Sequence, residues 1–165
     1  MEFIDQFESH YNYDCNYMRK LAKDAPEAFK AFVDFLPMGQ VGKSLPTDIL
    51  WTAKIAAMLT EDCGACVQLN ITMALEAGVN KNLVKNIIKA PENLEDRYKQ
   101  IYQFAKAVAA NQDGHLELQK EISKNYTAEQ VAELSIAISS TRIYPTIKRA
   151  LGEFKSCQLF DFSFS

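Results

Sequence analysis

Apolar residues recur every three or four positions along most of the chain, and this period places them on one face of an α-helix. The pattern predicts helices at about 3–11, 26–36, 49–59, 63–77, 80–88, 94–108, 116–124 and 127–151. Only the segment 159–165 alternates apolar and polar positions as a strand does. A single strand has no partner in such a sequence, so the predicted fold class is all-α, a bundle of roughly seven to nine helices.

Residues with strong end preferences mark the predicted helix boundaries. Polar caps are expected at three N-termini, namely Asp24 ahead of Pro26, Asn80, and Thr127 with Gln130 completing a capping box. Gly78 is suited to end the helix before it in a left-handed conformation, because glycine adopts positive φ at little cost. Tyr144–Pro145 is predicted to break or kink the last helix, since proline lacks the backbone N–H of a helical hydrogen bond.

Composition places the chain among folded globular proteins. It has 165 residues, of which 48% are hydrophobic and 24% charged, so we expect a single domain over residues 1–165. Residues 1–24 are predicted to be a helical N-terminal extension, and residues 153–165 an aromatic C-terminal tail. A net charge of −3 offers no broad basic surface, which argues against nucleic acid as a partner.

The sequence gives no sign of a membrane or an export signal. Its first residues carry acids where a signal peptide needs bases. The most apolar stretch, Ile49–Leu59, is too short to span a bilayer and contains Lys54. We therefore expect a cytoplasmic protein with no membrane partner.

Two aromatic segments are expected to need cover from water. Phe3, Phe7 and Tyr11 form an apolar stripe along the first predicted helix, and the segment 159–165 contains three phenylalanines. Exposed apolar segments promote association, so each is expected to pack on its own domain or on a neighbouring subunit. At least a homodimer is predicted.

The cysteines carry the main chemical hypothesis. The chain has four, too few for a secreted disulfide framework, and only Cys63 and Cys66 are close in sequence. At this spacing two thiols lie on one face of a helix, about one turn apart, where a disulfide can form with modest adjustment. A helix that begins near Cys63 has free N–H groups and a positive end, which stabilise a thiolate and lower the thiol pKa.

Two other interpretations of the pair are weighed against redox chemistry. Free cysteine is among the most buried residue types, so Cys63 and Cys66 are also explained as packing residues. A structural zinc site wants four ligands, and His10 and His115 are isolated from each other in the sequence. We expect neither a metal nor an organic cofactor.

Several motifs together resemble the AhpD-like, carboxymuconolactone decarboxylase superfamily, which includes alkylhydroperoxidases. They are Ala25-Pro-Glu-Ala-Phe29, Leu45-Pro46 before a helix of small apolar residues, Cys63-Gly-Ala-Cys66, and Met73-Ala-Leu-Glu-Ala-Gly-Val79. The resemblance implies an all-helical scaffold, a homo-oligomer, a peroxide or disulfide substrate and an external thiol reductant. It also implies that Cys66 attacks the peroxide and that Cys63 then resolves the sulfenate into a disulfide, whereas the helix-end argument favours Cys63 as the more activated thiol.

Two positions depart from the resemblance. Its peroxidase members have a histidine four residues after the second cysteine and a glutamate twelve residues before the first, which relay the proton that activates the thiol. Here these positions are Asn70 and Trp51. Asn70 is expected on the same face as the cysteines, where it can hydrogen-bond a thiolate or a water, but neither side chain accepts a proton at neutral pH.

Other charged residues are weaker candidates. Asp48, Glu61 and Asp62 are possible replacements for the missing base, although helix-cap chemistry explains each more simply. Arg142 and Lys148 are possible ligands of an anionic substrate, although a solvated helix face explains them.

The leading hypothesis for function is thiol-dependent peroxide reduction or disulfide exchange through Cys63 and Cys66. One alternative is a non-catalytic oligomeric binding or assembly protein on the same scaffold. Another is carboxymuconolactone decarboxylase-like activity, which requires a base and a group that holds an anion.

Overall fold

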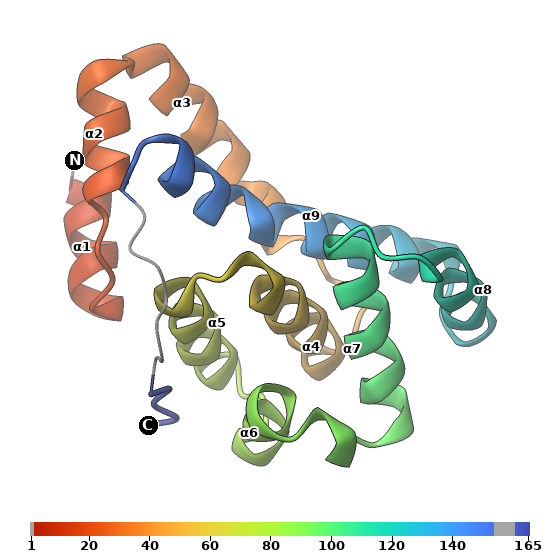
Figure 1. Cartoon of the computed structure of the whole chain (residues 1–165). Coiled ribbons are helices and arrows are strands. Elements are labelled where there is room, and N and C mark those ends of the chain that lie inside the picture. The colour runs from red at the N-terminus through yellow and green to blue at the C-terminus, as the bar shows by residue number, and fades with distance from the viewer. Residues whose placement is uncertain (1, 154–160) are drawn as a thin grey trace.

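Helices account for nearly all of the regular structure, as the periodicity predicts. The computed structural model describes residues 2–153 and 161–165, and within these the chain forms nine α-helices and no strand (Figure 1). The α-helices are α1 (Glu2–Tyr11), α2 (Asn16–Asp24), α3 (Pro26–Phe35), α4 (Thr47–Met58), α5 (Gly64–Glu76), α6 (Lys81–Lys89), α7 (Asp96–Ala109), α8 (His115–Asn125) and α9 (Ala128–Ala150). Three short 3-10 helices join them, namely η1 (Leu36–Gln40), η2 (Leu59–Glu61) and η3 (Pro91–Asn93). The all-α prediction is confirmed.

Helix α4 is the centre of the larger core. It packs against α5, α6, α7 and α9, and most of its residues are buried. The buried residues lie on all sides of the helix, since Ile49, Thr52, Ala53, Lys54 and Ile55 are among them. A helix that is apolar all round is stable only inside a protein, so the other helices must surround α4. No helix in the described part of the chain has the length and apolarity needed to cross a membrane.

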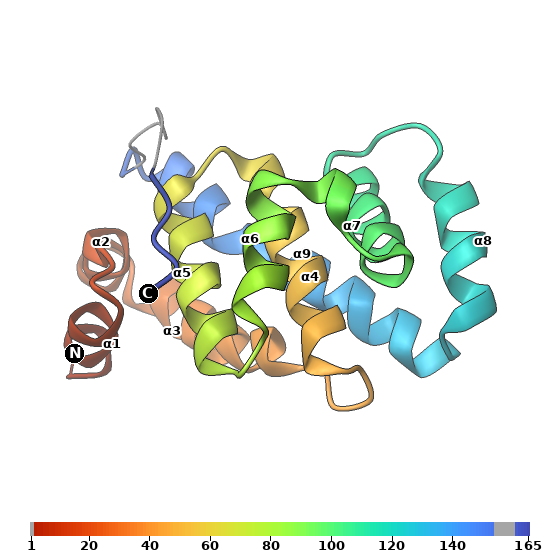
Figure 2. The same ribbon diagram turned by 90° about the horizontal axis from the view of Figure 1, so that it is seen from below.

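The N-terminal helices form a second hydrophobic cluster at one end of the molecule. Figure 2 shows α1 and α2 at this end and α8 at the other. Ile4 and Tyr17 are fully buried there, with Phe7 and Tyr11 packed around them. Phe3, at 40% exposure, is the outermost residue of the aromatic stripe. Most of the stripe is therefore covered by the chain itself.

The predicted N-terminal caps are right at two sites and wrong at one, and Gly78, with a φ of 85°, follows the end of α5 in the expected left-handed conformation. Asn80 accepts hydrogen bonds from the first turn of α6, and Thr127 and Gln130 form the capping box of α9. Asp24, however, is the last residue of α2, and Ala25 is the N-cap of α3 without a side-chain hydrogen bond. Helices α2 and α3 are separated by one residue, so Asp24 belongs to the end of α2 and does not cap α3.

The expected break at Tyr144–Pro145 does not occur. Helix α9 runs through Pro145, which is buried. Proline removes one backbone hydrogen bond, and the helix persists when its flanks are held by tertiary contacts. Arg142 and Arg149 supply such contacts on either side of Pro145, because both bind Glu61.

The end of the chain packs on α5. Phe164 is buried in the larger core, and the amide of Gln68 both donates to and accepts from the backbone of Ser163. Figure 1 shows this end beside α5. Residues 161–165 are irregular, so the strand expected at 159–165 is wrong for them, and 159–160 lie outside the described residues.

Replacing Asn80 with alanine is expected to lower the free energy of unfolding by about 1 kcal/mol, because two backbone N–H groups of α6 lose their acceptor. Urea unfolding followed by circular dichroism measures the change. Asn82→Ala in the same turn is the control and should have little effect. If both variants lost the same free energy of unfolding, the capping role of Asn80 would be contradicted.

Candidate functional site

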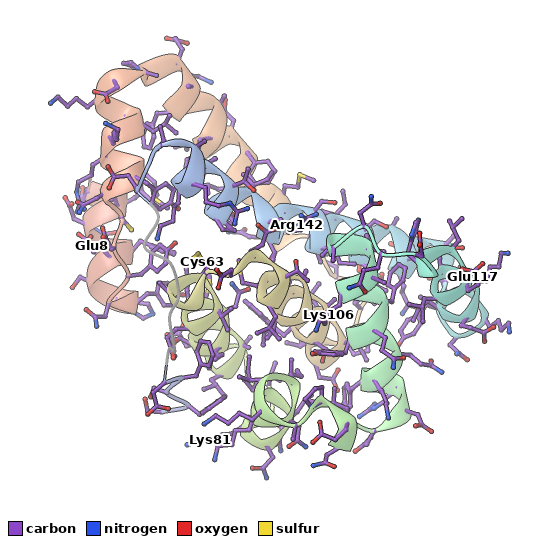
Figure 3. All side chains as sticks on the ribbon, viewed as in Figure 1. Glu8, Cys63, Lys81, Lys106, Glu117 and Arg142 are labelled. Atoms are coloured by element: carbon purple, nitrogen blue, oxygen red, sulfur yellow. A yellow bond between two sulfur atoms is a disulfide. The ribbon has the colours of Figure 1, made fainter. Side chains whose placement is uncertain are left out.

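Cys63 and Cys66 form a disulfide at the N-terminal end of α5, with 5.2 Å between their Cα atoms. Cys63 is the N-cap residue, and Cys66 lies in the first helical turn, which contains no acidic residue. Both cysteines are almost completely buried. Figure 3 labels Cys63 near the start of this helix, below α9. Cys66 therefore lies at the positive end of the α5 helix dipole, which favours a thiolate when the bond is reduced.

The turn before the disulfide is fixed by a buried carboxylate. Glu61 binds the guanidinium groups of both Arg142 and Arg149, and Arg149 also donates to the backbone carbonyl of Glu61 at 2.8 Å. Burial raises the pKa of Glu61, but the hydrogen bonds from Arg149 and Arg142 outweigh it and the pKa is lowered. Glu61 is therefore an ionised anchor and neither a helix cap nor a proton acceptor at neutral pH.

This anchor gives Arg142 a buried partner, although its side chain is still 41% exposed on α9. Arg142 Nε lies 2.5 Å from a Glu61 oxygen, and Figure 3 labels this residue on α9. Asp62, next in the chain, has a φ of 50°, a left-handed conformation that reverses the chain direction just before Cys63. The disulfide is thus positioned from α9 as well as from its own helix.

A tyrosine from the N-terminal extension contacts the disulfide. Tyr13 Oη lies 3.6 Å from Cys66 Sγ, and because a disulfide sulfur has no hydrogen, the phenol is the donor. Lys148 Nζ donates to the same oxygen at 3.4 Å and lies over the rings of Tyr13 and Tyr17. Lys148 is 7% exposed, so its interpretation as a solvated residue is wrong. Burial is the main cause that raises the pKa of Tyr13, which keeps the phenol protonated at neutral pH.

The loop that holds Tyr13 is organised by Glu8. Asn12, with a φ of 48°, turns the chain after α1, and the backbone N–H of Cys15 donates to Glu8 at 3.0 Å. Arg19 donates to the other oxygen of Glu8. The hydrogen bonds from Arg19 and then from Cys15 lower the pKa of Glu8 to about 2, so the anchor is charged at any physiological pH.

An apolar cavity of about 140 Å³ lies beside Cys66, at the junction of the two hydrophobic clusters. Residues of α1, α2, η1, α4, α5 and α9 line it, most of them aromatic or aliphatic. Tyr13 and Cys66 are in its wall, and so are Trp51, Lys54 and Asn70. Cys63 does not line the cavity. Of Cys63 and Cys66, the latter lines a space that is large enough for a small molecule.

The two residues that depart from the relay motif both lie in this wall. The Asn70 amide donates to the backbone carbonyl of Cys66 at 2.9 Å, so it supports the first turn of α5. Trp51 lies under the ammonium of Lys54, 4.7 Å from the ring centroid. Asp48, a suggested base, instead accepts a hydrogen bond from Tyr98.

The sequence did not predict Tyr13 and Lys54 as parts of the site, and it offered Lys148 only as a ligand of an anionic substrate. Nothing in local spacing links residue 13 to residue 66, because the contact depends on how the N-terminal helices fold back. Lys54 could have been predicted, because it interrupts the most apolar stretch of the sequence. A charge in a buried helix costs free energy, so its presence there indicates a function.

Cys15 is not among the residues that line the cavity. Cys15 is buried and donates to the carbonyl of Tyr13, and its pKa is raised to about 11, chiefly by burial. A buried thiol of this kind is inert. Cys157 lies outside the described residues. Within the described residues, no group of three or more His, Cys, Asp or Glu side chains is arranged to hold a metal ion.

Comparison of the chain with protein-family models, with curated proteins and with solved structures finds no match.

Glu61→Gln keeps the side-chain shape but removes its charge, and is expected to lower the free energy of unfolding at pH 7 by about 2 kcal/mol. The pKa of Glu61 is lower in the folded protein than its ordinary value of 4.5. The charge of Glu61 therefore contributes fully to stability above pH 4.5, and this contribution is lost as the pH falls through the pKa of the folded state. Urea unfolding from pH 7 to 3 should show the difference from wild type shrinking below pH 4.5.

Glu129→Gln is the matched control, since Glu129 is exposed in the first turn of α9. Its effect should stay within about 0.5 kcal/mol, as for most surface substitutions. If the free energies of unfolding of wild type and Glu61→Gln differed by the same amount at every pH, Glu61 would not act as a charged anchor.

Proposed function

We propose that the protein reduces small organic hydroperoxides, or exchanges disulfides, through Cys63 and Cys66. One observation carries the proposal: the two sulfurs are within bonding distance in the first turn of a helix, and the Cys66 sulfur faces a cavity under the phenol of Tyr13. A buried packing role for the cysteines does not require a cavity, a phenol or an ammonium beside one of them. The resemblance to alkylhydroperoxidases points to the same chemistry.

The proposed cycle begins with the reduced pair. The Cys66 thiolate attacks the terminal peroxide oxygen, an S–O bond forms, the O–O bond breaks, and the alkoxide leaves as an alcohol after taking a proton. The Cys63 thiol then attacks the sulfenic sulfur, the S–S bond forms, and the hydroxyl leaves with the thiol proton as water. The peroxide is reduced by two electrons and the two cysteines are oxidised to the disulfide.

The disulfide must be opened by another thiol before a second turnover. An external dithiol attacks one sulfur, passes through a mixed disulfide and leaves as its own disulfide, which returns two electrons to Cys63 and Cys66. If the protein exchanges disulfides instead, the same thiol–disulfide exchange either reduces the Cys63–Cys66 disulfide or oxidises a partner dithiol. Both sulfurs are buried, so a small dithiol reaches them more easily than a protein does. A protein reductant would need a local opening of the N-terminal helices.

Tyr13 and Lys148 take the place of the absent histidine and glutamate in this proposal. The phenol donates toward Cys66 Sγ and the ammonium donates to the phenol, so both stabilise negative charge on the sulfur. Tyr13 also lines the cavity, so in this proposal its phenol gives a proton to the leaving alkoxide. This arrangement stabilises the thiolate by hydrogen bonding and charge, without a neutral-pH base.

A thiol count after peroxide treatment tests the function. Reduced wild-type protein has four thiols and is expected to retain two after stoichiometric cumene hydroperoxide, as measured in denaturant. Cys63→Ser should stop at a sulfenate on Cys66 that dimedone traps, and Cys66→Ser should not react. No loss in wild type, or the same loss of two thiols in Cys66→Ser, would exclude the proposed cycle.

Tyr13→Phe is expected to slow the reaction with hydroperoxide by about ten- to a hundredfold, because the sulfur loses its hydrogen-bond donor. The pKa of the Cys66 thiol, followed by thiolate absorbance at 240 nm, should rise in the same variant. Tyr11→Phe removes a hydroxyl that binds Glu76 instead and is the control. A rate that falls with no change in the thiol pKa would contradict the stabilisation of the thiolate by Tyr13.

A further inference from the structure

Lys54 is a buried cation without a buried anion. The side chain belongs to the central helix α4 and is 7% exposed. Its ammonium donates to the carbonyl of Gly39 at 2.6 Å and lies over the ring of Trp51. Throughout residues 2–153 and 161–165, no carboxylate lies within ion-pair distance of it. Buried charges in proteins are ordinarily paired, so an ammonium in this setting is incomplete.

The ammonium lines the same cavity as Cys66. An ammonium has three N–H donors, and the bond to Gly39 uses one of them. No described carboxylate lines the cavity, and Lys54 is the one lysine or arginine among its described lining residues. Burial lowers the pKa of Lys54, which is the response of a cation that lacks a counter-charge. A bound anion would offset this desolvation.

The rest of the wall selects an apolar body. Aromatic rings from the N-terminal helices and aliphatic side chains from α4 and α5 form most of the surface, with Phe7, Met58 and Leu69 among them. A volume of about 140 Å³ is close to that of an engineered apolar cavity that binds benzene. The hydroxyls of Ser140 and Thr141 add only neutral polar groups on the α9 side.

We propose that this cavity binds a small organic carboxylate whose apolar body is about the size of a benzene ring and whose carboxylate pairs with Lys54. Such a ligand supplies the missing negative charge and fills the apolar space at once. Phosphate or another inorganic anion supplies only the charge and leaves the apolar wall uncovered. A neutral hydrocarbon fills the space and leaves the ammonium unpaired.

The position of the cavity connects this ligand to the disulfide. Because Cys66 is in the same wall, a carboxylate bound at Lys54 lies with its apolar body beside the reactive sulfur. The substrate class that follows is a small hydroperoxide that bears a carboxylate. This extension to the substrate rests on the proposed function, whereas the binding of the carboxylate does not.

Binding is tested on the oxidised protein, in which no turnover takes place. Benzoate is titrated against its neutral isostere benzamide by calorimetry, and Trp51, the sole tryptophan, reports by its fluorescence whether the ligand enters the cavity. Wild-type protein is expected to bind benzoate at least about tenfold more tightly than benzamide, a difference of ~1.4 kcal/mol. Lys54→Met keeps the length of the side chain and should abolish this preference.

Lys120→Met, an exposed change on α8, alters the net charge equally and should keep the preference. No binding of benzoate by wild type, or equal binding of benzoate and benzamide, would overturn the inference even if Lys54→Met failed to fold. A preference for benzoate that survives in folded Lys54→Met would overturn it as well. Carboxylate binding without thiol loss on peroxide treatment would leave this inference standing and exclude the peroxide reaction.

Discussion

The burial of α4 on every side is the constraint on which the rest of the structure depends. A helix of this kind has no solvent face, so α5, α6, α7 and α9 must cover it, and two of these helices, α5 and α9, line the cavity together with α4. The same constraint takes Lys54 out of water. Desolvation of that ammonium costs free energy, which the carbonyl of Gly39 and the ring of Trp51 offset only in part.

The cysteine pair is positioned by contacts that are distant in sequence. Glu61 ties the turn before Cys63 to α9, and the hydrogen bond from Tyr13 ties Cys66 to the N-terminal extension. Neither contact lies within α5 itself. The chemical environment of the sulfurs is therefore a property of the tertiary structure, even though the pair is adjacent within one helical turn.

Periodicity and caps predicted the helices well because both are local. The spacing of apolar residues gave the helical elements, and the side chains of Asn80 and Thr127 act within one turn. Asp24 and Pro145 were misjudged because neighbouring elements decide them: α2 extends to Asp24, and Glu61 holds both flanks of Pro145. The cysteines were predicted from their spacing, whereas the contacts that Tyr13 makes with Cys66 and with Lys148 depend on which helices meet.

The N-terminal segment forms one side of the cavity, and this links the disulfide to the stability of that segment. Phe3, Phe7, Tyr13 and Tyr17 all belong to the wall, so a local opening of α1 and α2 widens the access to Cys66. The free energy of that opening is a property of two helices that contain neither cysteine of the pair. A substitution that loosens α1 or α2 therefore exposes the disulfide without touching either sulfur.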